Sequence, residues 1–423
     1  MNMNEIINFM SRFIFFQLSD FYTYTFAVLF CIIFIVFLCK DKKNLNILFL
    51  IPLITSLYAG INYAFRFSNV HKTALLYWDI KGLHCANLAL DSGLSPYNGM
   101  ADCMFPNLPM LVAYQPIFLN FFWNISYLTF EIIWLITTIS FIYIIYFCSK
   151  RILDFKSNIL FFVIFLLGAY QGASWVTFQS GNIAIITYGL SVLFLYRLIV
   201  KEKQLGFFIL IGILTAFKYH FILLLLYPVF IKKRIDIKYH VLSFLVFISI
   251  TALSFYFYSH LYSELINDVI SVQLDQGLKP YPSELPIYQY FEPILSGLKF
   301  NTIFKGLIFL ILFFFLYREI KNNKELTTSD IFIIATFMIM IGLPRLKLYD
   351  LLLIIPCTLK FLENCYFQSF NKFSSKSIFL IIASSFFFYE PAWWWSNYAF
   401  YYIILLFILF LLQKATFLRR FSN

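Results

Sequence analysis

Asp79 is the residue of this sequence whose type and setting best suit acid–base chemistry. It stands near the start of the stretch YWDIKGLHCANLALDSGLSPYNG, which predicts a short helix with Asp79 as its N-cap. The helix dipole and backbone N–H groups hold a carboxylate at that position ionised, as a general base requires. Gly82, one turn later, leaves room for a substrate. The same residues also fit a simple cap on a helix that only packs.

His84 and Asp91 are two further polar residues of this helix that could contact a substrate. His84 could orient a substrate held at Asp79, although a lone histidine on an amphipathic helix is more often structural. Asp91 is either a second carboxylate of the site or a solvated charge at the helix end.

The helix that positions these residues has recognisable ends and two unlike faces. Gly93 suits the C′ position, and Pro96 stops continuation. Helical spacing puts apolar residues on one face and polar residues on another, and these are Ile80, Leu83, Ala86 and Leu90 against His84, Asn87 and Asp91. This pattern predicts an amphipathic helix lying on a membrane surface.

The composition of the chain indicates a membrane protein. Of its 423 residues, 61% are hydrophobic and only 13% are charged, which is more apolar surface than one soluble core could bury. The sequence contains no nucleic-acid-binding motif. Its 7 Cys include no C-x-x-C pair and have no His at ligand spacing, so a metal cluster is not expected.

Long apolar runs, separated by short polar or basic stretches, predict an all-α bundle of about thirteen transmembrane helices. The expected spans are 23–39, 46–64, 127–147, 158–173, 181–199, 205–217, 219–231, 240–259, 300–317, 330–343, 347–363, 377–389 and 398–413.

Basic residues fall on every second connection of this bundle, for example at Lys150 and Arg151 and at Lys232 to Arg234. Because Lys and Arg are retained on the cytoplasmic side, the pattern predicts an outer N-terminus and a cytoplasmic C-terminus. The net charge of +11 is then a signal of topology rather than of an acidic partner.

The predicted topology divides the chain into five segments. They are N-terminal spans (1–64), a first extracytoplasmic loop with Asp79 (65–126), a central bundle (127–259), a second extracytoplasmic loop (260–299) and a C-terminal bundle (300–423). Long ordered loops usually carry function, so we expect the chemistry in the two outer loops, together with short amphipathic helices.

The order of several short motifs resembles glycosyltransferase family 87, a member of the GT-C superfamily. The motifs are Asp79 with Gly93, Pro96 and Tyr97, then Tyr114-Gln115-Pro116, Gln179-Ser180-Gly181-Asn182, Gly212 with Ala216 and Lys218, and Pro344 to Asp350. The resemblance covers residues 60 to 360. Two motifs depart from the family pattern: the Gly-Asn element has a different residue order, and the late loop lacks a His that some members carry.

The resemblance implies a sugar transferase of the bacterial inner membrane. Members of the superfamily move a sugar from a polyprenyl-phosphate carrier to a hydroxyl of a lipid or glycan acceptor, usually with inversion, on the extracytoplasmic side. Asp79 would take the proton of the acceptor hydroxyl. The residues expected to contact substrate are His84, Asp91, Tyr97, Asn182 and Asp350.

A leaving phosphate gains negative charge as the glycosidic bond breaks, so the resemblance also requires cations at the site. The candidates on the predicted outer side are Lys218, His220, Arg345 and Lys347. Lys218 could instead snorkel to the lipid headgroups. Arg345 and Lys347 could instead pair with Asp350 or contact anionic lipid.

The outer loops hold no Asp-x-Asp pair, which favours a reaction that needs neither a metal nor another cofactor. Cys85 and Cys103 share the first outer loop and could form a disulfide in an oxidising compartment.

Two other functions stay open. A transporter or flippase of lipid-linked saccharides is one, although ion-coupled carriers usually have acidic groups in mid-membrane and often internal repeats, neither of which is evident. A non-catalytic scaffold of envelope glycan assembly is the other, because of the altered Gly-Asn element and the missing late-loop His.

Overall fold

The computed structural model of the protein describes residues 78–97, 114–119, 127–163, 165–166, 174, 177–178, 181–270, 301–343, 348–367, 407–408 and 410–411. The regular elements in these ranges are all helical, so the all-α prediction is confirmed for this part of the chain. The expected spans 23–39, 46–64 and 377–389 lie outside the described residues, as do Arg345, Lys347 and Cys103.

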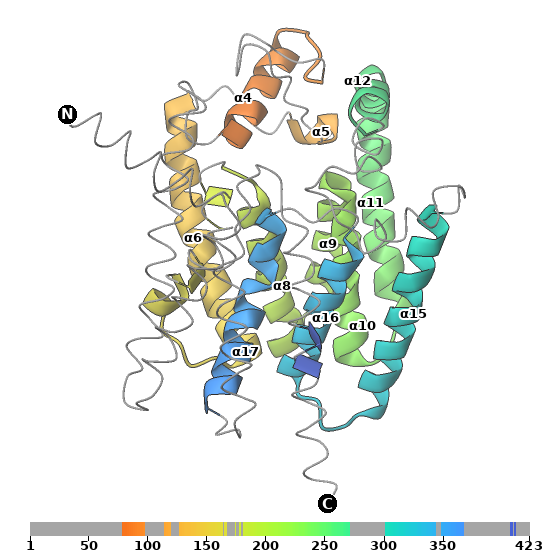
Figure 1. Ribbon diagram of the computed structural model, residues 1–423. Helices are drawn as coiled ribbons and strands as arrows, with labels where there is room; N and C mark the ends of the chain where they lie inside the picture. Colours follow the sequence, from red (N-terminus) through yellow and green to blue (C-terminus); the bar gives the residue numbers. More distant parts are fainter. Residues whose placement is uncertain are drawn as a thin grey trace, which may run out of the picture.

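The long helices run side by side as a bundle (Figure 1). They are α6 (Tyr127–Leu153), α8 (Ala184–Val200), α9 (Leu205–Phe217), α10 (Leu226–Lys232), α11 (Ile237–Phe257), α15 (Asn301–Asn322), α16 (Thr328–Gly342) and α17 (Ile355–Phe367). Two 3₁₀ segments, η2 (Tyr219–Leu225) and η4 (Leu348–Leu353), lead into α10 and α17. If η2 is counted as the first turn of α10 and η4 as the first turn of α17, each of these helices begins within three residues of a predicted span start.

Two described helical stretches, Ile132–Leu153 and Ile237–Phe257, are long and apolar enough to cross a membrane. Shorter apolar helices, among them Ala184–Val200 and Thr328–Gly342, stand beside them. The outward faces of the long helices carry large apolar side chains, such as Ile136 at 60% exposure and Phe314 at 63%. Exposed apolar surface of this extent is typical of a membrane protein. The total of about thirteen spans stays a prediction.

The core of the bundle lies between α6, α8, α9, α10, α16 and α17. It is built mainly from aromatic and branched aliphatic side chains, including Phe207, Phe230 and Ile333, which are fully buried. Close helix contacts need small residues. A Cβ added to Gly212 of α9 would lie 2.5 Å from the backbone oxygen of Ser243 in α11.

A small layer of loop elements covers one end of the bundle (Figure 1). It consists of α4 (Trp78–Asp91), α5 (Pro116–Leu119), α12 (Ser259–Glu264) and the π-helical segment Leu265–Ile270. The last turns of α6, α10 and α15, which carry basic residues, lie at the opposite end. The described chain therefore separates the loop elements from the basic connections, as the charge pattern predicts.

Helix α4 differs from the predicted surface helix in two respects. It includes Trp78, so Asp79 lies in its first turn rather than at the N-cap. Asn87, assigned to the polar face, is only 4% exposed, because neighbouring loop elements pack around the helix. The C-terminal end is as predicted: Gly93 has a φ of +70°, and the N–H of Leu94 donates to the Ala89 oxygen at 2.8 Å.

Candidate active site

Asp79 meets the start of α8, which lies far from it in the sequence. The side-chain Nδ2 of Asn182 donates a hydrogen bond of 2.6 Å to Oδ2 of Asp79. The other end of the Asn182 amide is also fixed, because its Oδ1 accepts from the backbone N–H of Ala184 at 2.9 Å. The amide therefore presents its NH₂ group to the carboxylate, and a hydrogen bond of this kind stabilises the ionised form.

A tight turn before α8 places Asn182 in this position. Gly181 has a φ of +68°, a conformation that favours glycine. The backbone N–H of Asn182 donates to the Thr177 oxygen at 3.0 Å. Asn182 is consequently buried, at 5% exposure, with its side chain directed by backbone contacts. Two motifs of the resemblance, Asp79 and Gly181-Asn182, thus come together.

Tyr114 brings an aromatic ring and a cation to the same place. Its ring stacks on Phe217, with 4.3 Å between the ring centroids and 20° between the planes. The Lys218 ammonium lies over the ring, with Nζ 5.3 Å from the centroid. Burial and, second, the charge of Asp79 raise the pKa of the Tyr114 phenol well above its usual value. Tyr114 is therefore a neutral phenol next to the Asp79 carboxylate and the Lys218 ammonium.

Lys218 stands at the predicted break between two apolar helices. It ends α9 and precedes η2 with an extended backbone, φ −145° and ψ 117°. A helix of 13 residues is about 20 Å long, shorter than a hydrocarbon core of about 30 Å. In Figure 1, α9 accordingly ends below the ends of α6 and α11 that lie next to the loop layer. Lys218 is half-buried, and the contact of its ammonium with the Tyr114 ring compensates part of its desolvation.

The other predicted phosphate-binding residues are described only in part. His220 follows Lys218 in η2 and is half-buried, with its ring 4.7 Å from that of Phe221. It lies in the same turn as Lys218, as predicted. Arg345 and Lys347 lie outside the described residues, so their placement stays a prediction.

Two side-chain contacts hold the backbone around Tyr114. The hydroxyl of Tyr97 donates to the backbone oxygen of Tyr114 at 2.7 Å. Nε2 of Gln115 donates to Oγ1 of Thr251 in α11 at 3.1 Å. Tyr97 was predicted to contact substrate, but it is 2% exposed and its hydroxyl already holds this segment. Its observed contact gives it a positioning role.

A polar contact joins the segment after α4 to α12 within the loop layer. The hydroxyl of Ser95, in the turn after α4, donates to the carboxylate of Glu264 in α12. The pKa of the Tyr97 phenol is raised, first by burial and then by the nearby Glu264 charge. The apolar residues around this contact are Leu83, Ala86, Tyr97, Leu119, Leu261 and Leu265. This loop layer fixes Tyr97, and through it Tyr114, above the bundle.

Asp350 of η4 is a second carboxylate that contacts α8, within the core of the bundle. It is 2% exposed, and its Oδ1 accepts a hydrogen bond of 2.7 Å from the hydroxyl of Tyr188. Tyr188 lies in the second turn of α8, whereas Asn182 lies in the turn that precedes this helix. Asp350 therefore contacts α8 further from the loop layer than Asp79 does, and its predicted contact with substrate stays a prediction.

His84 lies on a different face of α4 from Asp79, and Asp91 lies at the other end of the helix. His84 follows Asp79 by five residues, a rotation of about 140° around the helix. Asp91 is an exposed residue at the far end of α4, where Oδ2 accepts from Nδ2 of Asn87 at 3.5 Å. The geometry favours the reading of Asp91 as a solvated charge at the helix end. Neither residue shares the face of α4 that carries Asp79.

The cysteines divide between the loop layer and the bundle. Cys85 of α4 is in a disulfide whose partner lies outside the described residues. Its predicted pairing with Cys103 stays a prediction. Cys148 and Cys357 are buried free thiols. Within the described residues, no group of three or more His, Cys, Asp and Glu side chains is arranged to hold a metal.

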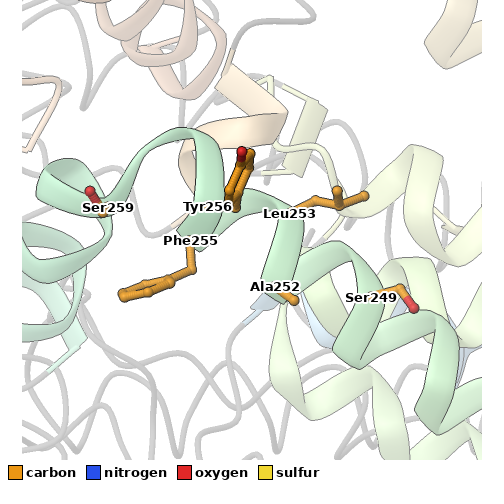
Figure 2. Close-up of a pocket in the computed structure, with 6 residues that line it drawn as sticks. All are labelled: Ser249, Ala252, Leu253, Phe255, Tyr256 and Ser259. Atoms are coloured by element: carbon orange, nitrogen blue, oxygen red, sulfur yellow. The ribbon is translucent and has the colours of Figure 1, made fainter.

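A hollow on the surface of α11 is separate from this site (Figure 2). It has a volume of about 710 Å³ and is lined by Ser249, Ala252, Leu253, Phe255, Tyr256 and Ser259. Thr251, which holds Gln115, is the neighbour of Ala252, but it is not part of this lining. The walls are mainly apolar and carry no charged group, so we do not place the chemistry there.

In the sequence, Tyr114 stands out only as part of a Tyr-Gln-Pro motif. No sequence signal indicates that its ring contacts Lys218 and lies near the Asp79 carboxylate. The Ser95 to Glu264 contact has no sequence signal, because the two residues are 169 positions apart. Comparison of the chain with models of known protein families, with curated proteins and with solved structures found no match.

Proposed function

We propose that the protein is an integral membrane glycosyltransferase that moves a sugar from a polyprenyl phosphate to a hydroxyl of a lipid or glycan acceptor. Asp79 is the general base. The hydrogen bond from Asn182 to Asp79 carries the proposal, because it joins two separate motifs of the resemblance and orients an ionised carboxylate. A structural cap on α4 would not need an amide from another helix.

The reaction follows from the charges around Tyr114. The acceptor hydroxyl attacks the anomeric carbon while its proton passes to the Asp79 carboxylate. The bond between that carbon and the phosphate oxygen breaks, and the phosphate leaves with the electron pair. Lys218 stabilises the added negative charge, with His220 in the same turn. Attack opposite the leaving group inverts the anomeric centre.

The proposed side of the membrane is extracytoplasmic, in a bacterial inner membrane. This rests on the position of α4, α5 and α12 at the end of the bundle opposite the basic last turns of α6, α10 and α15. Positive residues are retained in the cytoplasm, so the loop layer faces outward. The position of Lys218 at the end of α9, next to Tyr114, suits a carrier phosphate at the membrane surface.

The test is transfer by the purified protein. Wild type and Asp79→Asn are supplied with polyprenyl-phosphate sugars and candidate acceptors, and glycosylated product is followed by mass spectrometry. Loss of the base lowers turnover by about 100-fold or more. Asp91→Asn is the matched control, since it removes an exposed carboxylate of the same helix. Equal turnover of Asp79→Asn and wild type would eliminate Asp79 as the base.

One observation favours a carrier as the second candidate. Asp350 is an acidic residue buried among the helices, and such residues often belong to ion pathways. In that case the reconstituted protein would move lipid-linked saccharide across a vesicle membrane without forming a glycosidic bond, and Asp350→Asn would stop the movement. Product formation in the transfer assay, unaccompanied by translocation, rejects the carrier.

A further inference from the structure

Tyr114 lies near Asp79 and is held in place by several contacts. Its backbone oxygen is held by Tyr97 at 2.7 Å, and its ring is stacked on Phe217 at 4.3 Å. The next residue, Gln115, is tied to α11 through Thr251. Four contacts, counting Lys218 over the ring, come from the segment after α4, from α11 and from the end of α9, and together they fix the direction in which the phenol points.

None of these contacts uses the hydroxyl of Tyr114. The bond from Tyr97 goes to the backbone oxygen, Phe217 and Lys218 contact the ring, and within the described part of the chain no hydrogen bond of the Tyr114 hydroxyl occurs. Tyr114 is also only half-buried. A well-positioned hydroxyl that has no partner among the described residues, beside a carboxylate and an ammonium, has the properties of a group that contacts substrate.

The charges decide which substrate atom it contacts. The phenol is next to an anion, Asp79, and is neutral, so it can donate one hydrogen bond. A donor and the Lys218 ammonium on one ring together favour an anionic oxygen. A sugar hydroxyl would not need the cation.

We propose that the Tyr114 hydroxyl donates a hydrogen bond to a phosphate oxygen of the polyprenyl-phosphate donor, with Lys218 as the cation of the same subsite. The inference rests on the proposed function for the identity of the ligand. It goes beyond that function in assigning a further phosphate contact, one made by a neutral group. Because the proton stays on the tyrosine, the contact persists as the phosphate gains charge during transfer.

Tyr114→Phe tests the hydroxyl by itself. The variant keeps the ring, and so keeps the stack on Phe217, the contact with Lys218 and the backbone bond from Tyr97. Binding of a polyprenyl monophosphate to the detergent-solubilised full chain is measured by calorimetry. We expect the affinity to fall about 10- to 100-fold, as for a lost hydrogen bond to a charged group. Tyr219→Phe is the matched control, since Tyr219 is adjacent to Lys218 and 56% exposed.

The outcomes are distinct. Equal affinity of Tyr114→Phe and wild type overturns the proposal, provided that Tyr219→Phe also binds normally. Equal competition by phosphatidylglycerol or by inorganic phosphate overturns the assignment to the donor and indicates a general anion site. Binding can be measured without turnover, so the two proposals can fail separately. If Tyr114→Phe binds the polyprenyl phosphate more weakly but the wild-type protein transfers no sugar, the proposed function is rejected and the phosphate contact is supported.

Discussion

At the scale of single residues, the two hydrogen bonds of the Asn182 side chain allow only one orientation of its amide. Its oxygen is held by the Ala184 N–H and its nitrogen by Asp79, so a rotated amide would break both contacts. A rotated amide would also set two oxygens against each other at Asp79. The position therefore requires a group with a donor and an acceptor in this arrangement, which few side chains offer.

Removing this amide gives a prediction for the catalytic step. In Asn182→Ala, the Asp79 carboxylate loses its orienting donor, so we expect kcat to fall about 10-fold or more while donor affinity changes little. Asn158→Ala is the control, because Asn158 also accepts a backbone N–H, from Phe161 at 2.9 Å, but lies outside the site. Transfer rates and donor binding are measured on the same preparations. A raised donor dissociation constant with unchanged kcat would contradict an orienting role.

The sequence indicated some residues of the candidate site but not others. Asp79 stood out because it begins a helix in a chain with few charges, and Lys218 because it interrupts two apolar runs. Tyr114 did not, because 56 Phe and 29 Tyr make any aromatic residue unremarkable by type. The contact between Asp79 and Asn182 spans 103 positions, so it could be expected only from the motif order, not from local spacing.

At the scale of elements, helix starts were predicted well because a span is a long apolar run with clear ends. The predicted break at Lys218 is confirmed, with α9 ending at Phe217. Helix α4 was predicted less well. A period of 3.6 residues shows which face is apolar, but it does not show that other loop elements pack over Asn87. The environment of a loop helix depends on contacts that no local pattern records.

The close approach of α9 and α11 gives a prediction on stability. In Gly212→Ala the new Cβ meets the backbone oxygen of Ser243 at 2.5 Å, and backbone cannot rotate away. We expect a loss of about 1–3 kcal/mol, as for other overpacked cores. In Gly206→Ala the Cβ instead meets the flexible ring of Phe194 at 2.9 Å, so a smaller loss is expected.

Thermal unfolding in detergent, followed by thiol exposure or scattering, compares the two glycine variants. The ranking is the test: Gly212→Ala should unfold at a lower temperature than Gly206→Ala. An equal or reversed order would mean that α9 and α11 separate easily, and that Gly212 is not a packing requirement.

At the scale of the whole molecule, the two ends of the bundle differ in charge and in what covers them. One end carries α4, α5 and α12, and the other carries the basic last turns of α6, α10 and α15. The proposed sugar transfer requires the first end to face outward. Sidedness can be measured without any assay of activity, and so it tests the frame of the proposal separately from its chemistry.

Ser92 and Lys203 are suitable positions for this measurement, because both are exposed and they lie at opposite ends of the bundle, after α4 and before α9. Ser92→Cys should react with a membrane-impermeant maleimide in intact cells. Lys203→Cys should react only after permeabilisation, because basic connections are cytoplasmic. The unsubstituted protein gives the background of the native cysteines, two of which, Cys148 and Cys357, are buried. The reverse labelling pattern would place Asp79 on the cytoplasmic side. The proposed extracytoplasmic sugar transfer at this site would then be rejected.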